Sequence, residues 1–187
     1  MNNDRMALAL AVITASKFKK LHNLQDNSHN LTQKQHILTK NEFLQNICRM
    51  SGVERFTYFA QNNHVLDFDN DYWNVLGTIW KDDGSVAETQ ELFVELLRNP
   101  ARRNKHKIMK TNERREYAKL PKVVTAYRAC GHIDEIGTSI SWSLDKKFVE
   151  RYAESTGRTI IATLDFKKSE IFAYFNRRNE SEIIVRI

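Results

Sequence analysis

The sequence predicts an α+β fold, with helices in the first half of the chain and strands toward its end. Apolar residues recur at helical spacing through much of residues 1–100, whereas β-branched runs without Gly or Pro follow Pro121. The two prolines, Pro100 and Pro121, enclose a segment rich in Lys and Arg. We therefore expect a helical region over residues 1–100, a basic connecting segment over 101–120 and a strand-containing region over 121–187.

The helical region is expected to contain three helices: Met6–Leu24, Lys40–Ser51 and Val86–Leu97. Lys81–Gly84 reads as a turn, and Trp80 before it as a core residue. The apolar run of ten residues from Met6 to Ala15 is too short for a membrane span, which needs about 20 residues. It also lacks a clearly basic flank, so we expect a buried helix, no membrane association and a cytoplasmic protein.

The charge of the chain is concentrated in the connecting segment. Residues 101–120 hold eight Lys or Arg against Glu113 and Glu116, an excess equal to the net charge of +6 of the whole chain. Such a segment is either a solvated helix face or a guide for an anion, and the solvated face is slightly favoured. Nucleic acid binding through Arg102–Lys119 therefore stays open.

Cysteine and histidine usage gives no sign of a metal site. The two cysteines, Cys48 and Cys130, are isolated, and the six histidines are scattered without ligand spacing. We expect no metal and no disulfide framework.

The strand-containing region has a readable order of elements. Strands or extended segments are expected at Val123–Arg128, Gly137–Ser143, Thr159–Phe166 and Glu182–Val185, with a helix at Asp145–Ala153. Four aromatic residues are expected in the core: Tyr127, Trp142, Phe148 and Tyr152.

Two carboxylates stand at the start of the last strand. Residues i and i+2 of a strand point to the same side, so Glu180 and Glu182 are expected to project together. Two like charges this close cost energy beside a buried strand, and the pair therefore points to a site that holds a cationic species.

The order Arg, Ser-x-Ser, Glu-x-Glu resembles the mono-ADP-ribosyltransferases of the Arg-Ser-Glu class. The resemblance covers about residues 120–187 and rests on Tyr127-Arg128, Ser141-Trp142-Ser143, the helix from Asp145 and Glu180-Ser181-Glu182. It implies a small split β-sandwich that binds NAD between its sheets, with no metal. It further implies transfer of ADP-ribose from NAD to a macromolecular acceptor.

The resemblance also implies residue roles. Glu182 is the catalytic glutamate that stabilises an oxocarbenium-like transition state, and Glu180 goes with transfer to arginine. Arg128 would bind the NAD ribose or pyrophosphate, and Ser141 would hydrogen-bond Glu182. Ser143 matches the third position of its motif.

Two further positions complete the expected NAD site. Ala129 stands where many members have Gly, and its backbone can still contact NAD if its φ is negative. Tyr174 or Phe175 would stack on nicotinamide or on the acceptor. The turn Asn176–Asn179 would meet the acceptor, and Glu113–Tyr117 would close over NAD.

A protein arginine is the favoured acceptor, and the general resemblance favours a phage-encoded modifier of host machinery. One alternative is ADP-ribosylation of nucleic acid. Another is a binding module without catalysis that uses the basic segment. The intact glutamate pair argues against the last.

Overall fold

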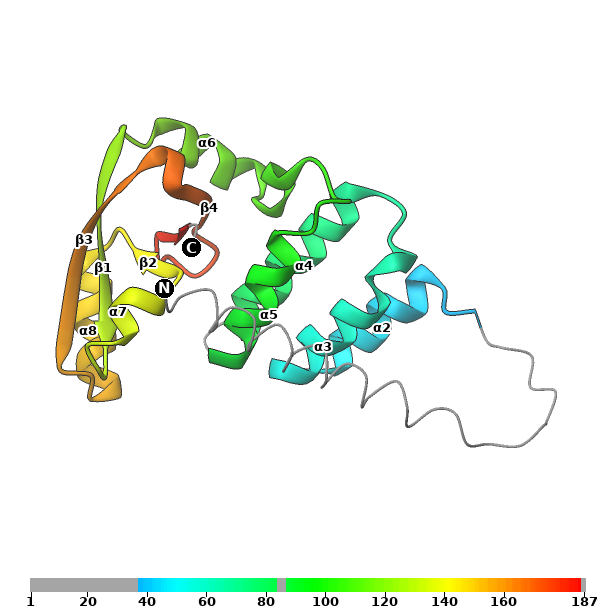
Figure 1. Ribbon diagram of the computed structural model, residues 1–187, viewed down its shortest axis with the longest axis horizontal. Coiled ribbons are helices and arrows are strands. Elements are labelled where there is room, and N and C mark those ends of the chain that lie inside the picture. Colours follow the sequence, from blue (N-terminus) through cyan, green and yellow to red (C-terminus); the bar gives the residue numbers. More distant parts are fainter. Residues whose placement is uncertain (1–36, 84–86, 186–187) are drawn as a thin grey trace, which may run out of the picture. The chain divides into compact units, whose positions relative to one another are not determined.

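The computed structural model describes residues 37–83 and 87–185. Leu38–Ile187 form one compact unit, in which helices come first and a five-stranded antiparallel sheet follows (Figure 1). The α+β class predicted from the sequence is confirmed. The change from helices to strands falls after Lys119, close to the expected start of the strand-containing region. The helix expected at Met6–Leu24 lies outside the described residues.

The helices before the sheet include two that the sequence analysis identified, at Lys40–Ser51 and Val86–Leu97. They are α2 (Lys40–Arg49), α3 (Gly52–Asn62), α4 (Asp69–Asp83), α5 (Ala87–Leu97) and α6 (Thr111–Lys119), with 3-10 turns η1 (Asn63–Val65) and η2 (Lys105–Ile108). Helix α2 begins at a capping box, in which Thr39 and Glu42 satisfy each other's backbone amides. It buries Phe43 and Ile47, as its apolar spacing predicted.

The strands and the elements between them follow α6. They are β1 (Val123–Cys130), α7 (Glu135–Thr138), β2 (Ser141–Ser143), α8 (Lys146–Thr156), β3 (Ile160–Lys167), η3 (Lys168–Glu170), β4 (Ile171–Phe175) and β5 (Glu182–Val185). Asp145 caps α8 by accepting a hydrogen bond from the Phe148 amide, and Gly157 ends the helix at a φ of 69°.

The sheet has the strand order β3-β1-β2-β5-β4. Strands β1 and β3 pair along their whole length, from Val123↔Lys167 to Cys130↔Ile160. By contrast, β1 and β2 are joined by one residue pair, Tyr127↔Ser143. The described strands therefore form a single sheet, and the joint in its middle, between β1 and β2, is narrow.

A shared core joins the helices to the sheet. Phe56, Trp73 and Phe93 of the helices belong to the same buried cluster as Trp142 and Ile183 of the strands. Helix α8 packs on β1, and α6 packs on β4 (Figure 1). Burial of this apolar surface holds the end of α4 against the strands that bear the candidate site.

Three local expectations were wrong. Lys81–Asp83 is not a turn but the last part of α4. The segment Gly137–Ser143 is not extended throughout, because Gly137 and Thr138 belong to the short helix α7; Ser139 is extended, and strand β2 begins at Ser141. Tyr152 is not a core residue, since it is 42% exposed, although it stacks on Phe148 one helical turn away as the spacing required.

Candidate active site

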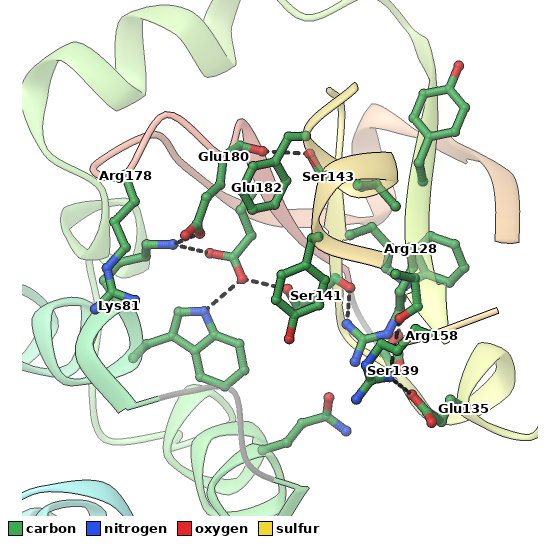
Figure 2. A pocket seen from close by; sticks show the side chains of 18 of the residues that line it. Lys81, Arg128, Glu135, Ser139, Ser141, Ser143, Arg158, Arg178, Glu180 and Glu182 are labelled. Atoms are coloured by element: carbon green, nitrogen blue, oxygen red, sulfur yellow. Dashed lines mark hydrogen bonds and ion pairs between the residues drawn. The ribbon is translucent and has the colours of Figure 1, made fainter. Parts of the chain in front are cut away.

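A cavity of about 600 Å³ opens where α4, β1, β2, α8 and the loop before β5 meet. Glu180, Glu182 and Lys81 lie on one side of it, Arg128, Arg158 and Glu135 on the other, and Ser141 between them (Figure 2). Cavities of roughly 300–1,000 Å³ are typical of small-molecule sites. The narrow joint between β1 and β2 lies at this cavity, because Tyr127 and Ser143 both line it.

Glu182 is the first residue of β5, and its carboxylate accepts three hydrogen bonds from other side chains of the cavity. One carboxylate oxygen accepts from the Ser141 hydroxyl at 2.5 Å and from Trp80 Nε1 at 3.2 Å. The other oxygen accepts from Lys81 Nζ at 2.9 Å. The hydrogen bond expected between Ser141 and Glu182 is thus confirmed, and both oxygens of Glu182 are held in place.

Glu180 also lies in this site, but it is not part of β5, so the alternation of side chains along a strand does not explain its position. It precedes β5, in a loop where Asn179 and Ser181 have positive φ values of 57° and 46°. Its carboxylate accepts from Lys81 Nζ at 2.5 Å, so one ammonium joins both glutamates. The expected convergence of the pair is confirmed, but a left-handed turn at Ser181 produces it.

Lys81 and Trp80 are site residues that sequence reasoning missed. Both come from the last turns of α4, and Lys81 is only 6% exposed. Trp80 was expected in the core and does stack on Phe93, with ring centroids 4.1 Å apart. Had α4 been extended to Asp83, the i, i+4 spacing Trp73, Gly77, Lys81 would have placed the lysine on the buried face.

Arg128 lies on β1 and combines burial with spare donor capacity. Its Nη1 donates to the Ser141 carbonyl at 2.6 Å, while its buried Nε has no hydrogen-bond partner among the described residues. Burial lowers the pKa of the Arg128 guanidinium below its ordinary value. A buried donor without a partner costs free energy, and the Arg128 side chain also lines the cavity, where its charge favours an anionic ligand.

The far side of the cavity holds a second pair that was not predicted. Arg158 Nη1 donates to Glu135 at 2.5 Å and to the Ala129 carbonyl at 3.2 Å. Burial acts to raise the pKa of Glu135, but the hydrogen bonds from Arg158 and the Gly131 amide outweigh it, so that this pKa is lowered. Ala129 itself lines the cavity without a positive φ, which meets the condition set for its backbone contact.

Of the two remaining predicted residues, Ser143 lines the cavity and Tyr174 does not. Ser143 lines the cavity, but its hydroxyl donates to the Glu180 carbonyl at 2.6 Å and accepts from the Asp145 amide at 3.0 Å, which ties the glutamate loop to the start of α8. Tyr174 is buried away from the cavity, with its hydroxyl 3.5 Å from that of Ser181. The structure therefore does not bring Tyr174 to the site.

The turn Asn176–Asn179 and helix α6 were both expected to contact the ligand, but most of their residues lie away from the cavity. Arg177 is engaged in a buried ion pair with Glu113 of α6, and only Arg178 of the turn lines the cavity. Arg114 and Arg115 do not line it. The expected closure of α6 over NAD has no support in this arrangement.

Two further findings concern the described residues only. Within 37–83 and 87–185, no cluster of three or more His, Cys, Asp or Glu side chains is placed to hold a metal ion. None of the described helices combines the length and the apolar character that crossing a bilayer requires.

Comparisons of the chain with protein-family models, with curated proteins and with solved structures found no match. What the site does must therefore be argued from its own chemistry.

Proposed function

We propose that the protein is an NAD-dependent mono-ADP-ribosyltransferase. The observation that carries the proposal is that Glu182, fixed by the Ser141 hydroxyl, shares one cavity with Arg128, whose buried Nε has no partner among the described residues. A carboxylate and an unsatisfied guanidinium suit a substrate with a ribose that becomes positive and a diphosphate that is negative. NAD is such a substrate.

Arg128 is assigned to the diphosphate or ribose of NAD. A guanidinium is a planar, permanently charged donor fork that matches phosphate oxygens, and Arg128 lines the cavity. Arg158 on the same side of the cavity adds positive charge, although Glu135 balances part of it.

Glu182 is assigned to the reacting ribose. As the bond between ribose C1′ and the nicotinamide nitrogen breaks, its electron pair leaves with nicotinamide and positive charge develops on the sugar. The ionised carboxylate stabilises that charge, and the hydrogen bonds from Ser141 and Trp80 mean that little reorganisation is needed.

Glu180 is assigned to the acceptor. A nitrogen of the acceptor guanidinium forms the new bond to C1′, and its proton passes to Glu180. With a pKa above about 12, a guanidinium needs such a carboxylate partner to become a nucleophile. A protein arginine is accordingly the acceptor that we propose.

The split sandwich implied by the resemblance is retained as part of the proposal. The support for it is the single residue pair that joins β1 to β2, which divides the sheet into β3-β1 and β2-β5-β4 halves beside the cavity.

A nucleic acid acceptor is the second candidate. It is favoured by a hollow of about 380 Å³ that lies apart from the cavity and is lined by Lys107, Lys110 and Arg114 together with Asn70, Asn74 and Thr111. If this hollow binds a phosphate backbone, affinity for oligonucleotides falls steeply as salt is raised. An affinity that does not respond to salt excludes this candidate.

The test is incubation of purified protein with labelled NAD and a cell lysate, using the wild type, Glu182→Gln and the matched control Glu150→Gln. Glu150 is an exposed residue of α8 that pairs with Lys146 and does not line the cavity. We expect labelled product from the wild type and Glu150→Gln, and a loss of about 10²–10³-fold for Glu182→Gln. Protease or nuclease treatment of the product then identifies the class of acceptor.

Release of nicotinamide without an acceptor is measured in parallel. A folded wild-type protein that neither transfers label nor releases nicotinamide overturns the proposal. Equal activity of the wild type and Glu182→Gln overturns the role of Glu182.

A further inference from the structure

The Lys81 ammonium lies between the two glutamates of the candidate site. Its distances to the nearest carboxylate oxygens are 2.5 Å for Glu180 and 2.9 Å for Glu182. All three side chains line the cavity, and Glu180 and Glu182 are 21% and 10% exposed. The chain therefore supplies its own cation to the pair of carboxylates.

The charges of this cluster are unequal. Two carboxylates and one ammonium leave a net charge of one negative unit, in a partly desolvated place where charge interactions are stronger than in water. Without Lys81 the pair would hold two like charges close together, an arrangement that attracts a cation strongly. The pair is thus a cation site, and Lys81 is the cation seen in it.

The way Lys81 is held differs from that of a permanent structural cation. Lys81 has a long side chain near the end of α4, and within the described part of the chain its ammonium donates hydrogen bonds to the two glutamates alone. An ammonium is a point charge, whereas a guanidinium offers a planar fork that binds carboxylates in bidentate fashion. A guanidinium entering from the cavity competes well for the same oxygens.

We infer that Lys81 is a specificity-determining residue, which fills the place of the acceptor's cationic group and is displaced when an acceptor guanidinium binds Glu180 and Glu182. The identification of the competing cation as the acceptor's guanidinium rests on the proposed function. The binding of a cation by Glu180 and Glu182 does not. Displacement by a ligand of the same charge preserves the charge balance of the pair. A neutral group cannot replace the charge of Lys81 and therefore does not displace it from the two glutamates.

The inference is tested by binding, without NAD and therefore without catalysis. Agmatine, which carries one guanidinium and one ammonium group, is the guanidinium probe, butylurea is a neutral probe that lacks both charges, and calorimetry gives the affinities. Lys81→Gln keeps a side-chain N–H donor but removes the competing charge. We expect it to bind agmatine on the order of tenfold more tightly than the wild type, with no change for butylurea.

Three matched variants locate the effect. Lys40→Met removes a lysine whose ion pair with Asp71 lies outside the cavity, and it leaves agmatine binding at the wild-type value. Adding Glu180→Gln to Lys81→Gln abolishes the gain. Lys81→Arg places a better-matched cation in the pair and weakens agmatine binding below the wild type, a result that stands even where Lys81→Gln fails to fold.

Equal agmatine affinity for the folded wild type, Lys81→Gln and Lys81→Arg overturns the inference, as does a gain that survives Glu180→Gln. NAD cleavage by the wild type is measured separately. Absence of cleavage together with the expected binding overturns the proposed function and leaves the cation site standing.

Discussion

Two buried charge clusters tie the helices to the last strands, and they differ in what surrounds them. The cavity cluster consists of Lys81, Glu180 and Glu182, and the hub consists of Glu113 and Arg177. Both connect a helix with the segment between β4 and β5. Only the cavity cluster lines the cavity.

The hub is closed and nearly saturated with hydrogen bonds. Glu113 is 1% exposed and accepts from the amides of Lys110 and Asn176 as well as from Arg177. Arg177 also donates to two carbonyl groups, those of Gly77 and Ile108.

The cavity cluster has one ammonium for two carboxylates and shares its cavity with Arg128, whose buried Nε has no partner among the described residues. Burial of a charge therefore does not by itself mark a site. Charge that is left unbalanced at the wall of a cavity does.

The largest effect on stability is expected at the hub. Glu113→Ala leaves the Arg177 guanidinium without its carboxylate and should lower the free energy of unfolding by about 3–5 kcal/mol. Glu116→Ala is the control on the same helix, because its ion pair with Lys119 is exposed and contributes about 0–1 kcal/mol. Urea unfolding measures both, and equal losses would show that the hub is no more important than a surface pair.

The cavity cluster is expected to affect activity instead. Ser141→Ala removes a hydrogen bond to the Glu182 carboxylate, worth about 1.5–3 kcal/mol, and should lower kcat of NAD cleavage accordingly with little change in unfolding. Ser155→Ala is the control, since that hydroxyl lies on α8 and bonds only the Tyr152 carbonyl among the described residues. A fall in stability that matches the fall in activity would make Ser141 a structural residue like those of the hub.

The next largest effect on stability is expected where Gly77 packs closely against Ile108 beside the hub. A Cβ at Gly77 would lie 2.5 Å from the Ile108 carbonyl oxygen, which Arg177 also contacts. Gly77→Ala should therefore destabilise the protein by about 1–3 kcal/mol, although alanine normally favours a helix. Gly137→Ala, with nothing within 4 Å of its Cβ, is the control in thermal unfolding. A stabilised Gly77→Ala protein would contradict the packing described for the hub.

The smallest effect concerns the Glu135–Arg158 pair on the far side of the cavity. The pKa of Glu135 is lowered in the folded protein, so the pair stabilises above the unfolded pKa of about 4.3 and this contribution is lost as the pH falls through the lowered value. The wild type should exceed Glu135→Gln in stability at neutral pH, and the difference should vanish in acid. Unfolding midpoints across this range check it, and a difference that persists in acid would rule out the ion pair as its source.

Much of the fold was predictable because periodicity is local. The spacing of Phe43 and Ile47 identified α2, and β-branched runs identified β1, β3 and β5. The end of α4 was missed because Lys-Asp-Asp-Gly has the composition of a turn, while tertiary packing of Trp80 on Phe93 holds those residues in a helix.

The candidate site was predictable only where its residues lie on paired strands. Ser141 and Glu182 belong to β2 and β5, which pair directly, so their hydrogen bond followed from the motif order. Tyr174 failed as a site residue because β4 presents it to the interior beside Met109 and Ser181.

The sequence by itself determined the α+β class and the approximate bounds of α2, α5, α8, β1, β3 and β5, because these depend on local periodicity. The approach of Ser141 to Glu182 followed from the resemblance of the motif order. Only the tertiary structure decided that Lys81 lies between the glutamates, 99 and 101 residues away along the chain from Glu180 and Glu182. It also decided that Arg177 pairs with the buried Glu113, while the buried Nε of Arg128 has no partner in the part of the chain that the structure describes. The physical reason is that burial and charge pairing depend on surfaces that meet after folding, which no local pattern encodes.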